Sequence, residues 1–181
     1  MMALMAAAVA LVGAVCLINL VLTVGLIRRL REHSDALAKL SSSSDEQLIA
    51  TVGARVGDFD ATTTTGEQIG RSDLASEMLV GFFSPDCQPC VRGLPNFIER
   101  ARGATAGPAG VLAVVTGAGP EAQSMREQLQ PVAQVVAGTE DGPVERAFGV
   151  RGYPAYALVG SDGRIAASGY RLEALADAVA T

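Results

Sequence analysis

Cys87 and Cys90 are the residues of this 181-residue chain whose types and spacing most directly permit chemistry. They form a Cys-Gln-Pro-Cys motif between the apolar run Met78–Phe83 and a helix predicted over Gln88–Arg102. A cysteine at a helix N-terminus has its thiolate stabilised by unpaired backbone N–H groups and by the helix dipole. A second cysteine one helical turn on can close a disulfide with it. The pair can therefore exchange between dithiol and disulfide through a mixed disulfide with a partner.

A structural zinc site and a purely structural disulfide are the alternatives for this pair. Structural zinc normally takes four ligands, and the other cysteine and histidine residues are Cys16 and His33. Cys16 lies in an apolar N-terminal run and His33 in the polar segment after it, so we predict no metal site. A disulfide that closes so short a loop adds little stability through chain entropy. The spacing favours redox chemistry over both alternatives.

The N-terminal run from Met1 to Ile27 contains no Asp, Glu, Lys or Arg. A helix needs about 20 apolar residues to cross a bilayer, so the run is long enough. A cleavable signal peptide begins with basic residues and has a shorter apolar run of about 7–15 residues. We therefore predict an uncleaved transmembrane anchor over residues 1–27.

Three arginines follow this anchor, and no basic residue precedes it: Arg28, Arg29 and Arg31. By the positive-inside rule alone they would place the rest of the chain in the cytoplasm. Residues 28–51 are predicted to form a stalk and a Ser-rich linker. Residues 52–181 are predicted to form one globular domain, a normal size for a domain.

The predicted domain alternates short apolar runs with helix signals, which indicates an α/β fold. The runs typical of buried strands are Met78–Phe83, Val111–Thr116 and Val132–Ala137. Helices are predicted over Gln88–Arg102, Pro120–Gln130 and Leu172–Ala180. The segments Ala155–Val159 and Arg164–Ser168 flank an Asp-Gly turn and predict an antiparallel hairpin at one end of a mixed sheet flanked by helices.

Composition excludes several classes of protein. The chain is 49% hydrophobic and 18% charged, which is incompatible with disorder throughout. Its 20 glycines follow no repeat, which excludes a collagen-like chain. Its 3 cysteines are too few for a scaffold held together by disulfides. A net charge of −5 argues against nucleic acid as a partner, because such proteins usually carry a basic face.

Two prolines complete a recognisable pattern around the cysteines. Pro95 falls five residues after Cys90, and a Gly-Val-Arg-Gly-Tyr-Pro-Ala segment that contains Pro154 precedes the hairpin. With the anchor, the Val-Gly-Asp-Phe segment from residue 56 and the Phe-Ser-Pro-Asp-Cys lead-in, the chain resembles the thioredoxin superfamily. It is most similar to the TlpA/MauD-like branch of membrane-anchored thiol–disulfide oxidoreductases. The resemblance covers residues 52–181 and implies a thioredoxin-like fold.

The resemblance also implies roles for the matching residues. Cys87 matches the exposed nucleophile and Cys90 the resolving thiol. Pro154, after Tyr153, matches a cis-proline that lies against the cysteine pair and leaves backbone groups open to pair with a substrate.

Three further residues are expected to support the site. Phe83 would back the active-site turn, and Pro89 lies within the motif. Pro95, inside the predicted helix, predicts a kink just beyond the cysteines, because a proline in a helix interior removes one hydrogen bond and clashes.

The sequence departs from the family's pattern at two positions. Asp86 replaces the aromatic residue that often precedes the first cysteine, and its carboxylate opposes formation of the Cys87 thiolate. Gly81 stands where many relatives carry a proton-relaying acid. Glu77 and Glu140 are the candidates to replace that acid.

The expected function is disulfide exchange with a client protein, with no cofactor beyond the cysteine pair and with a membrane redox partner that recycles it. TlpA-like domains act outside the cytoplasmic membrane, where client disulfides persist, so we expect the domain there in spite of the arginines. A non-catalytic binding or maturation module is one alternative. A thiol peroxidase is another, because Ser84-x-x-Cys87 resembles the Thr-x-x-Cys of peroxiredoxins. Val80 stands where that motif has proline.

Overall fold

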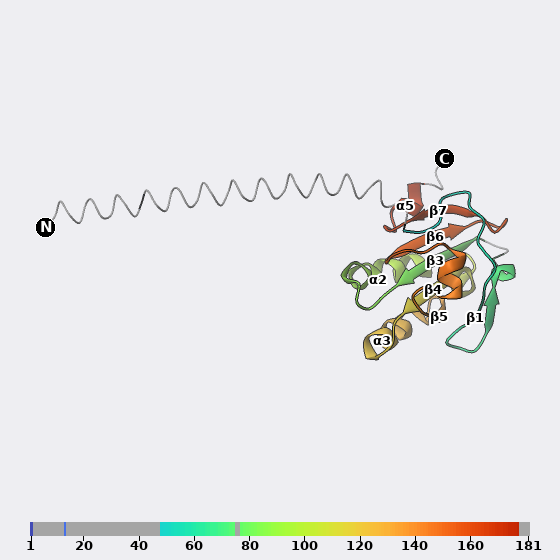
Figure 1. The fold of residues 1–181 in the computed structure, drawn as a ribbon, viewed down its shortest axis with the longest axis horizontal. Coiled ribbons are helices and arrows are strands. Elements are labelled where there is room, and N and C mark those ends of the chain that lie inside the picture. Colours follow the sequence, from blue (N-terminus) through green and yellow to red (C-terminus); the bar gives the residue numbers. More distant parts are fainter. Residues whose placement is uncertain (2–12, 14–47, 75–76, 178–181) are drawn as a thin grey trace. The chain divides into compact units, whose positions relative to one another are not determined.

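A computed structural model describes residues 48–74 and 77–177, together with Met1 and Gly13 (Figure 1). The anchor predicted over residues 1–27 and most of the stalk predicted over 28–51 lie outside these residues. Among the residues that are described, no helix is both long and apolar enough to cross a membrane.

The centre of the fold is a five-stranded mixed sheet with the order β5-β4-β3-β6-β7. Strands β3, β4 and β5 run parallel, whereas β6 and β7 are antiparallel to their neighbours. The predicted antiparallel pair at one end of the sheet is thereby confirmed. The strands are β3 (Met78–Phe83), β4 (Val111–Thr116), β5 (Gln134–Gly138), β6 (Ala155–Val159) and β7 (Ile165–Gly169).

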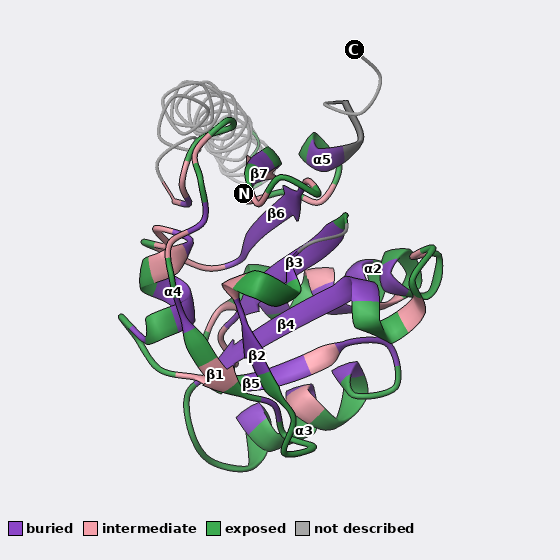
Figure 2. Cartoon of the chain, turned by 90° about the vertical axis from the view of Figure 1, so that its right-hand side faces the viewer, coloured by how far each residue is buried: buried purple, intermediate pink, exposed green. Residues whose placement is uncertain are grey.

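Burial explains why the inner strands read as unbroken apolar runs. Every residue of β3 and β4 is buried, and Figure 2 shows both strands in purple. A strand that is covered on both faces gains from apolar side chains at every position, not at alternate positions. The sequence therefore identified these two strands with the bounds that the structure has.

Helices cover one face of the sheet, and a hairpin with a short helix covers the other. The first core contains side chains of α2 (Gln88–Arg102), α3 (Pro120–Leu129) and α5 (Ala174–Asp177). The second contains residues from around the β1–β2 hairpin (Asp60–Thr62 and Gln68–Gly70) and from α4 (Pro143–Ala147). Two 3-10 turns complete the described elements, η2 (Arg71–Asp73) and η3 (Gly107–Gly110).

The structure differs from the sequence-based expectations mainly at the ends of elements. The strand predicted from Val132 begins at Gln134, because the chain still turns after α3, where the Val132 N–H donates to the Leu129 carbonyl. The last strand begins one residue later than predicted, at Ile165. The predicted helix over 172–180 is described only as Ala174–Asp177, and its last residues lie outside the described part.

Three aromatic rings fasten α2 to the sheet. Phe83 packs edge-on against Phe97 of α2, with ring centroids 5.0 Å apart, and lies 5.8 Å from the ring of Tyr156 in β6. Phe97 stacks on Tyr156 at 5.9 Å. A Cβ atom at Gly81 would lie 2.7–2.8 Å from the rings of Phe97 and Phe83. These rings therefore occupy the space that an acid at position 81 would need.

We expect Gly81→Ala to lower the free energy of unfolding by about 1–3 kcal/mol, because the added methyl group overpacks the aromatic cluster. Urea unfolding of the full-length protein in detergent measures the change. Gly103→Ala is the matched control, since its Cβ would meet only the Arg100 carbonyl oxygen at 3.4 Å. Equal stability of the two variants would contradict the expectation.

Candidate active site

The cysteine pair lies where β3 passes into α2. Cys87 is the N-cap of α2, with an extended backbone, and its amide donates to the Ser84 carbonyl oxygen at 3.2 Å. The Cys90 N–H donates to Cys87 Sγ at 3.3 Å. The sulfur therefore takes the place of the oxygen that usually caps a helix N-terminus. A thiolate here receives both that N–H and the positive end of the helix dipole.

Cys87 and Cys90 are joined by a disulfide, with Cα atoms 5.2 Å apart. Cys87 is half-buried, whereas Cys90 is 0% exposed. A partner can therefore reach Cys87 but not Cys90. This difference in access agrees with the nucleophilic and resolving roles that the resemblance implied.

The loop before β6 lies against the disulfide. The Tyr153–Pro154 peptide bond is cis, as the resemblance implied, and Pro154 is buried. The Tyr153 carbonyl oxygen lies 3.3 Å from Cys87 Sγ, so residues 66 positions apart meet at the reactive sulfur. In the dithiol state this oxygen can accept a hydrogen bond from the Cys87 thiol.

The other predicted support residues lie around the same helix start. Phe83 is fully buried beneath the motif. Pro89 is exposed in the first turn of α2, where a proline costs no hydrogen bond. Pro95 is exposed in the helix interior, and the kink expected from it stays a prediction.

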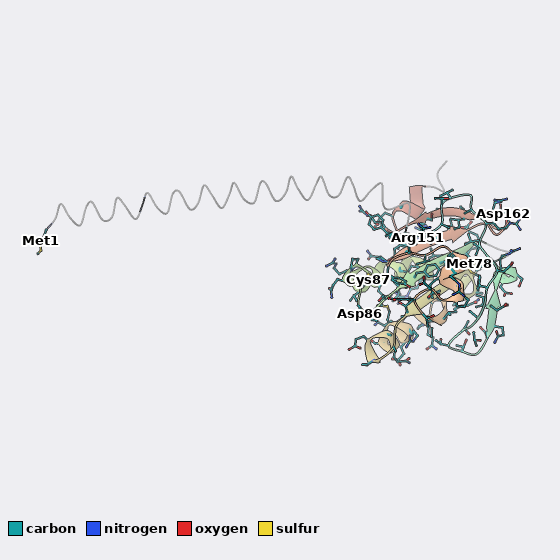
Figure 3. All side chains as sticks on the ribbon, in the orientation of Figure 1. Met1, Met78, Asp86, Cys87, Arg151 and Asp162 are labelled. Carbon is teal, nitrogen blue, oxygen red and sulfur yellow. A yellow bond between two sulfur atoms is a disulfide. The ribbon has the colours of Figure 1, made fainter. Side chains whose placement is uncertain are left out.

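Two charged residues adjoin the site in the sequence, and Figure 3 labels both: Asp86 directly precedes Cys87, and Arg151 lies two residues before Tyr153, whose carbonyl contacts Cys87 Sγ. Asp86 is exposed directly before Cys87, so its carboxylate opposes the effect of the helix dipole through a well-solvated path. Arg151 is also exposed, and among the described residues its guanidinium forms no ion pair.

Neither acid considered as a substitute for Gly81 lies beside the cysteines in the core. Glu77 precedes β3, whereas Cys87 follows it, so the strand separates the two. Glu140 is exposed in the turn between β5 and α4. Instead, the structure buries Glu145, which is 1% exposed. The sequence carried no signal for this, because an acid in the first turn of a helix ordinarily faces solvent and favours the helix dipole.

The Glu145 carboxylate has no hydrogen-bond partner among the described residues. It occupies space left by the missing Cβ atoms of Gly138 and Gly142. Burial raises the pKa of Glu145 above its ordinary range. Burial also raises the pKa of Tyr153, the Thr116 hydroxyl opposes that shift, and the Glu145 charge adds to it. The charges of Glu145, Glu140 and Asp141 thus act on the residue whose carbonyl contacts Cys87.

We expect Glu145→Gln to raise the free energy of unfolding at pH 8 by about 1–3 kcal/mol, because the buried charge has no partner. The pKa of Glu145 is higher in the folded state, so folding disfavours its ionised form. The free energy of unfolding should therefore fall as pH rises from about 4.3, the pKa of a glutamate in the unfolded chain, through the raised pKa of Glu145 in the folded state.

Urea unfolding at pH 4.5 and pH 8 tests this expectation. Glu145→Gln should show a smaller loss between the two pH values than the parent protein. Glu140→Gln, a change at an exposed acid five residues away, should follow the parent. The expectation would be contradicted if all three proteins lost the same free energy of unfolding between pH 4.5 and pH 8.

Within the described residues, no group of three or more His, Cys, Asp or Glu side chains could hold a metal ion. The chemistry available at this edge of the sheet is that of the two sulfurs. The reactive sulfur lies half-exposed at a helix N-terminus and is bonded to a buried sulfur. The loop with the cis-proline contacts it. This arrangement defines the site of a thioredoxin-like redox protein.

Comparisons with known proteins agree with this class. Residues 52–168 match the family model of the AhpC/TSA family, and the chain belongs to that family. A search of curated protein sequences finds no match.

Solved structures share the fold at low identity. The thioredoxin domain of a thiol-disulfide oxidoreductase from Bacteroides vulgatus is 20% identical, with a TM-score of 0.57 over 72% of this chain and 96% of that one. A putative thioredoxin from Neisseria meningitidis is 22% identical, with a TM-score of 0.57 over 70% and 89%. A secreted disulfide oxidoreductase from Mycobacterium tuberculosis, homologous to Escherichia coli DsbE, is 20% identical, with a TM-score of 0.52 over 68% and 96%. These likenesses establish the thioredoxin-like fold.

Proposed function

We propose that the protein is a thiol–disulfide oxidoreductase that exchanges disulfides with client proteins through Cys87 and Cys90. The observation that carries the proposal is the half-exposed Cys87 Sγ at the N-terminus of α2, bonded to a fully buried Cys90. The solved structures with this fold include proteins described as thiol-disulfide oxidoreductases, which supports the same chemistry.

In the reducing direction, the Cys87 thiolate attacks one sulfur of a client disulfide. The client's other sulfur leaves as a thiolate, and a mixed disulfide joins Cys87 to the client. Cys90 then loses its proton and attacks Cys87 Sγ, which releases the second client thiolate and leaves the Cys87–Cys90 disulfide. Two electrons pass from the pair to the client. The oxidising direction reverses these steps, and relative reduction potentials decide between them.

The chain's own groups act at defined points of this exchange. The Cys90 N–H and the N-terminus of α2 stabilise the thiolate on Cys87 whenever it attacks or leaves. The Tyr153 carbonyl contacts one side of the Cys87 sulfur, and Pro154 follows it in the chain. A client polypeptide bonded to this sulfur therefore lies next to the Tyr153–Pro154 loop. Burial of Cys90 restricts its attack to the neighbouring Cys87 Sγ, so Cys90 resolves the mixed disulfide and does not attack a client directly.

The particular branch we propose is the TlpA/MauD-like one, with the domain held outside the cytoplasmic membrane by residues 1–27. The uncharged run and the Phe-Ser-Pro-Asp-Cys lead-in support this assignment. The similar Mycobacterium tuberculosis protein is described as secreted, and a similar pneumococcal thioredoxin as an exposed lipoprotein. A membrane redox partner would then restore the cysteine pair after each turnover.

A thiol peroxidase is the second candidate, because membership of the AhpC/TSA family favours it. Ser84 lies three residues before Cys87, where peroxiredoxins carry threonine. However, the hydrogen bond between these two residues joins the Cys87 N–H to the Ser84 carbonyl, not hydroxyl to sulfur. Val80, at the position of the missing proline, is buried within β3. Consumption of hydrogen peroxide by the reduced protein distinguishes this candidate from disulfide exchange.

We expect Cys90→Ser to trap a mixed disulfide between Cys87 and a client, because no resolving thiol is left to release it. Non-reducing electrophoresis of the full-length protein, followed by mass spectrometry, detects the trapped species. Cys87→Ser is the matched control and should trap little, since Cys90 is buried. If neither variant forms a mixed disulfide, the cysteines do not exchange, and a binding or maturation module becomes the better description.

We expect Cys87 to react with a membrane-impermeant maleimide in intact cells only after brief external reduction of its disulfide with Cys90. A Cys16→Ser variant removes the third cysteine, so any mass shift reports the pair. A parallel sample without reductant gives the resting redox state. Labelling that requires cell lysis would place the domain in the cytoplasm and contradict the proposed location.

A further inference from the structure

A pocket of about 560 Å³ opens beside the disulfide, between α2 and the segment that follows β7. Its wall includes Pro89, from within the cysteine motif, and Pro154, the residue after the carbonyl that contacts Cys87 Sγ. Pro89 and Pro154 therefore place the pocket next to the sulfur that a client polypeptide would join in a mixed disulfide. The residues that flank the client cysteine are therefore the ones that can enter it.

Arginines line the pocket from opposite sides. Arg92 comes from the exposed face of α2, and Arg171 comes from the segment between β7 and α5. Among the described residues, Arg92 forms no ion pair, and Arg171 pairs only with the neighbouring Glu173 at 3.8 Å. Both members of that pair are mostly exposed, so the ion pair contributes little and does not neutralise the pocket. Glu173 also lines the pocket, so two guanidinium groups and one carboxylate face this space, and their charges sum to +1 on a chain whose net charge is −5.

A tyrosine hydroxyl group faces the same space. Tyr156 is 2% exposed and lines the pocket, and its hydroxyl would lie 3.2 Å from a Cβ atom on Gly93, another lining residue. No hydrogen bond to this hydroxyl occurs among the described residues, although the rest of the side chain is buried. Burial raises the pKa of Tyr156 to about 12, so the group remains a hydrogen-bond donor at neutral pH. Because this hydroxyl opens into the pocket without a protein partner, it is available to donate a hydrogen bond to a ligand.

We propose that this basic pocket, defined by Pro89, Arg92, Pro154, Tyr156 and Arg171, binds a carboxylate side chain next to the reactive cysteine of a client polypeptide. The inference rests on the proposed disulfide exchange and specifies its substrate as an acidic polypeptide. Guanidinium groups match the planar carboxylate with two parallel hydrogen bonds. The Tyr156 hydroxyl supplies a third donor from the floor of the pocket.

Such a pocket selects substrates by binding, not by the redox step. The sulfurs react in the same way with any accessible disulfide, whereas the arginines hold only clients with an Asp or Glu beside the cysteine. A lysine at that position would meet like charge from both walls, which is unfavourable. Small disulfides that carry carboxylates, such as glutathione disulfide, share the recognised chemistry but lack the neighbouring polypeptide.

Disulfide-bonded peptides that differ only at the residues flanking cysteine test the proposal with the full-length protein in detergent. The flanking residues are Glu, Gln or Lys. Dithiothreitol re-reduces the Cys87–Cys90 pair after each turnover, and after subtraction of its uncatalysed rate, reduction of each peptide gives kcat and KM separately. We expect kcat/KM for the Glu peptide to exceed that for the Lys peptide by about tenfold or more. Arg92→Gln combined with Arg171→Gln should bring the ratio to within about twofold, mainly through a higher KM for the Glu peptide.

Matched variants separate recognition from general damage. Arg100→Gln, a change in the last turn of the same helix and outside the pocket, should leave the preference intact. Tyr156→Phe keeps the aromatic ring and removes only the hydroxyl, so it should lower the Glu-to-Lys ratio. Circular dichroism checks that each variant is folded.

The outcomes distinguish the pocket from the proposed function itself. Equal kcat/KM for the Glu and Lys peptides in the parent protein would overturn the pocket assignment while disulfide exchange stands. Failure to exchange with any of the three peptides, as disulfides with the reduced protein or as dithiols with the oxidised protein, would overturn the proposed function. The protein could also reduce glutathione disulfide more efficiently than the Glu peptide, with the same loss in the double variant. That result would overturn the choice of a polypeptide as the occupant of the pocket.

Discussion

The packing of α2 against the end of β3 is the contact on which the rest of the structure depends. Phe83, the last residue of β3, packs against Phe97 of α2, and both rings pack against Tyr156 of β6. Gly81 leaves room for these rings. Because α2 starts immediately beyond this cluster, its N-terminus and the Cys87 sulfur are held at one place on the sheet edge, and the loop with Pro154 reaches the same place from the neighbouring strand.

Electrostatic effects at this edge oppose one another. The N-terminus of α2 and the Cys90 N–H favour a thiolate on Cys87, whereas the exposed Asp86 disfavours it. Asp86 acts through water, while the N–H contact is direct and partly buried, so the helix terminus is the stronger influence. Glu145 adds a second kind of effect, because its buried charge raises the pKa of Tyr153, the residue whose carbonyl touches the reactive sulfur.

Chemistry and recognition are divided between different parts of the fold. The disulfide depends on β3, α2 and the loop before β6, which are set by core packing. The basic pocket takes its second wall from the segment after β7, which packs less deeply and carries exposed charges. Substitution there can alter which client is held without disturbing the cysteines. A thioredoxin-like fold thereby keeps one reaction while its substrate preference changes.

The sequence by itself determined the strands β3, β4 and β6, the helix α2 and the cysteine pair, because apolar runs, helix signals and motif spacing are local properties. The cis bond before Pro154 came from family resemblance, since local preference favours trans. Only the tertiary structure decided that Glu145 is buried and that Arg92, Tyr156 and Arg171 line one pocket. Those residues come from α2, β6 and the segment after β7, and no local pattern records a proximity that sheet order and helix packing create.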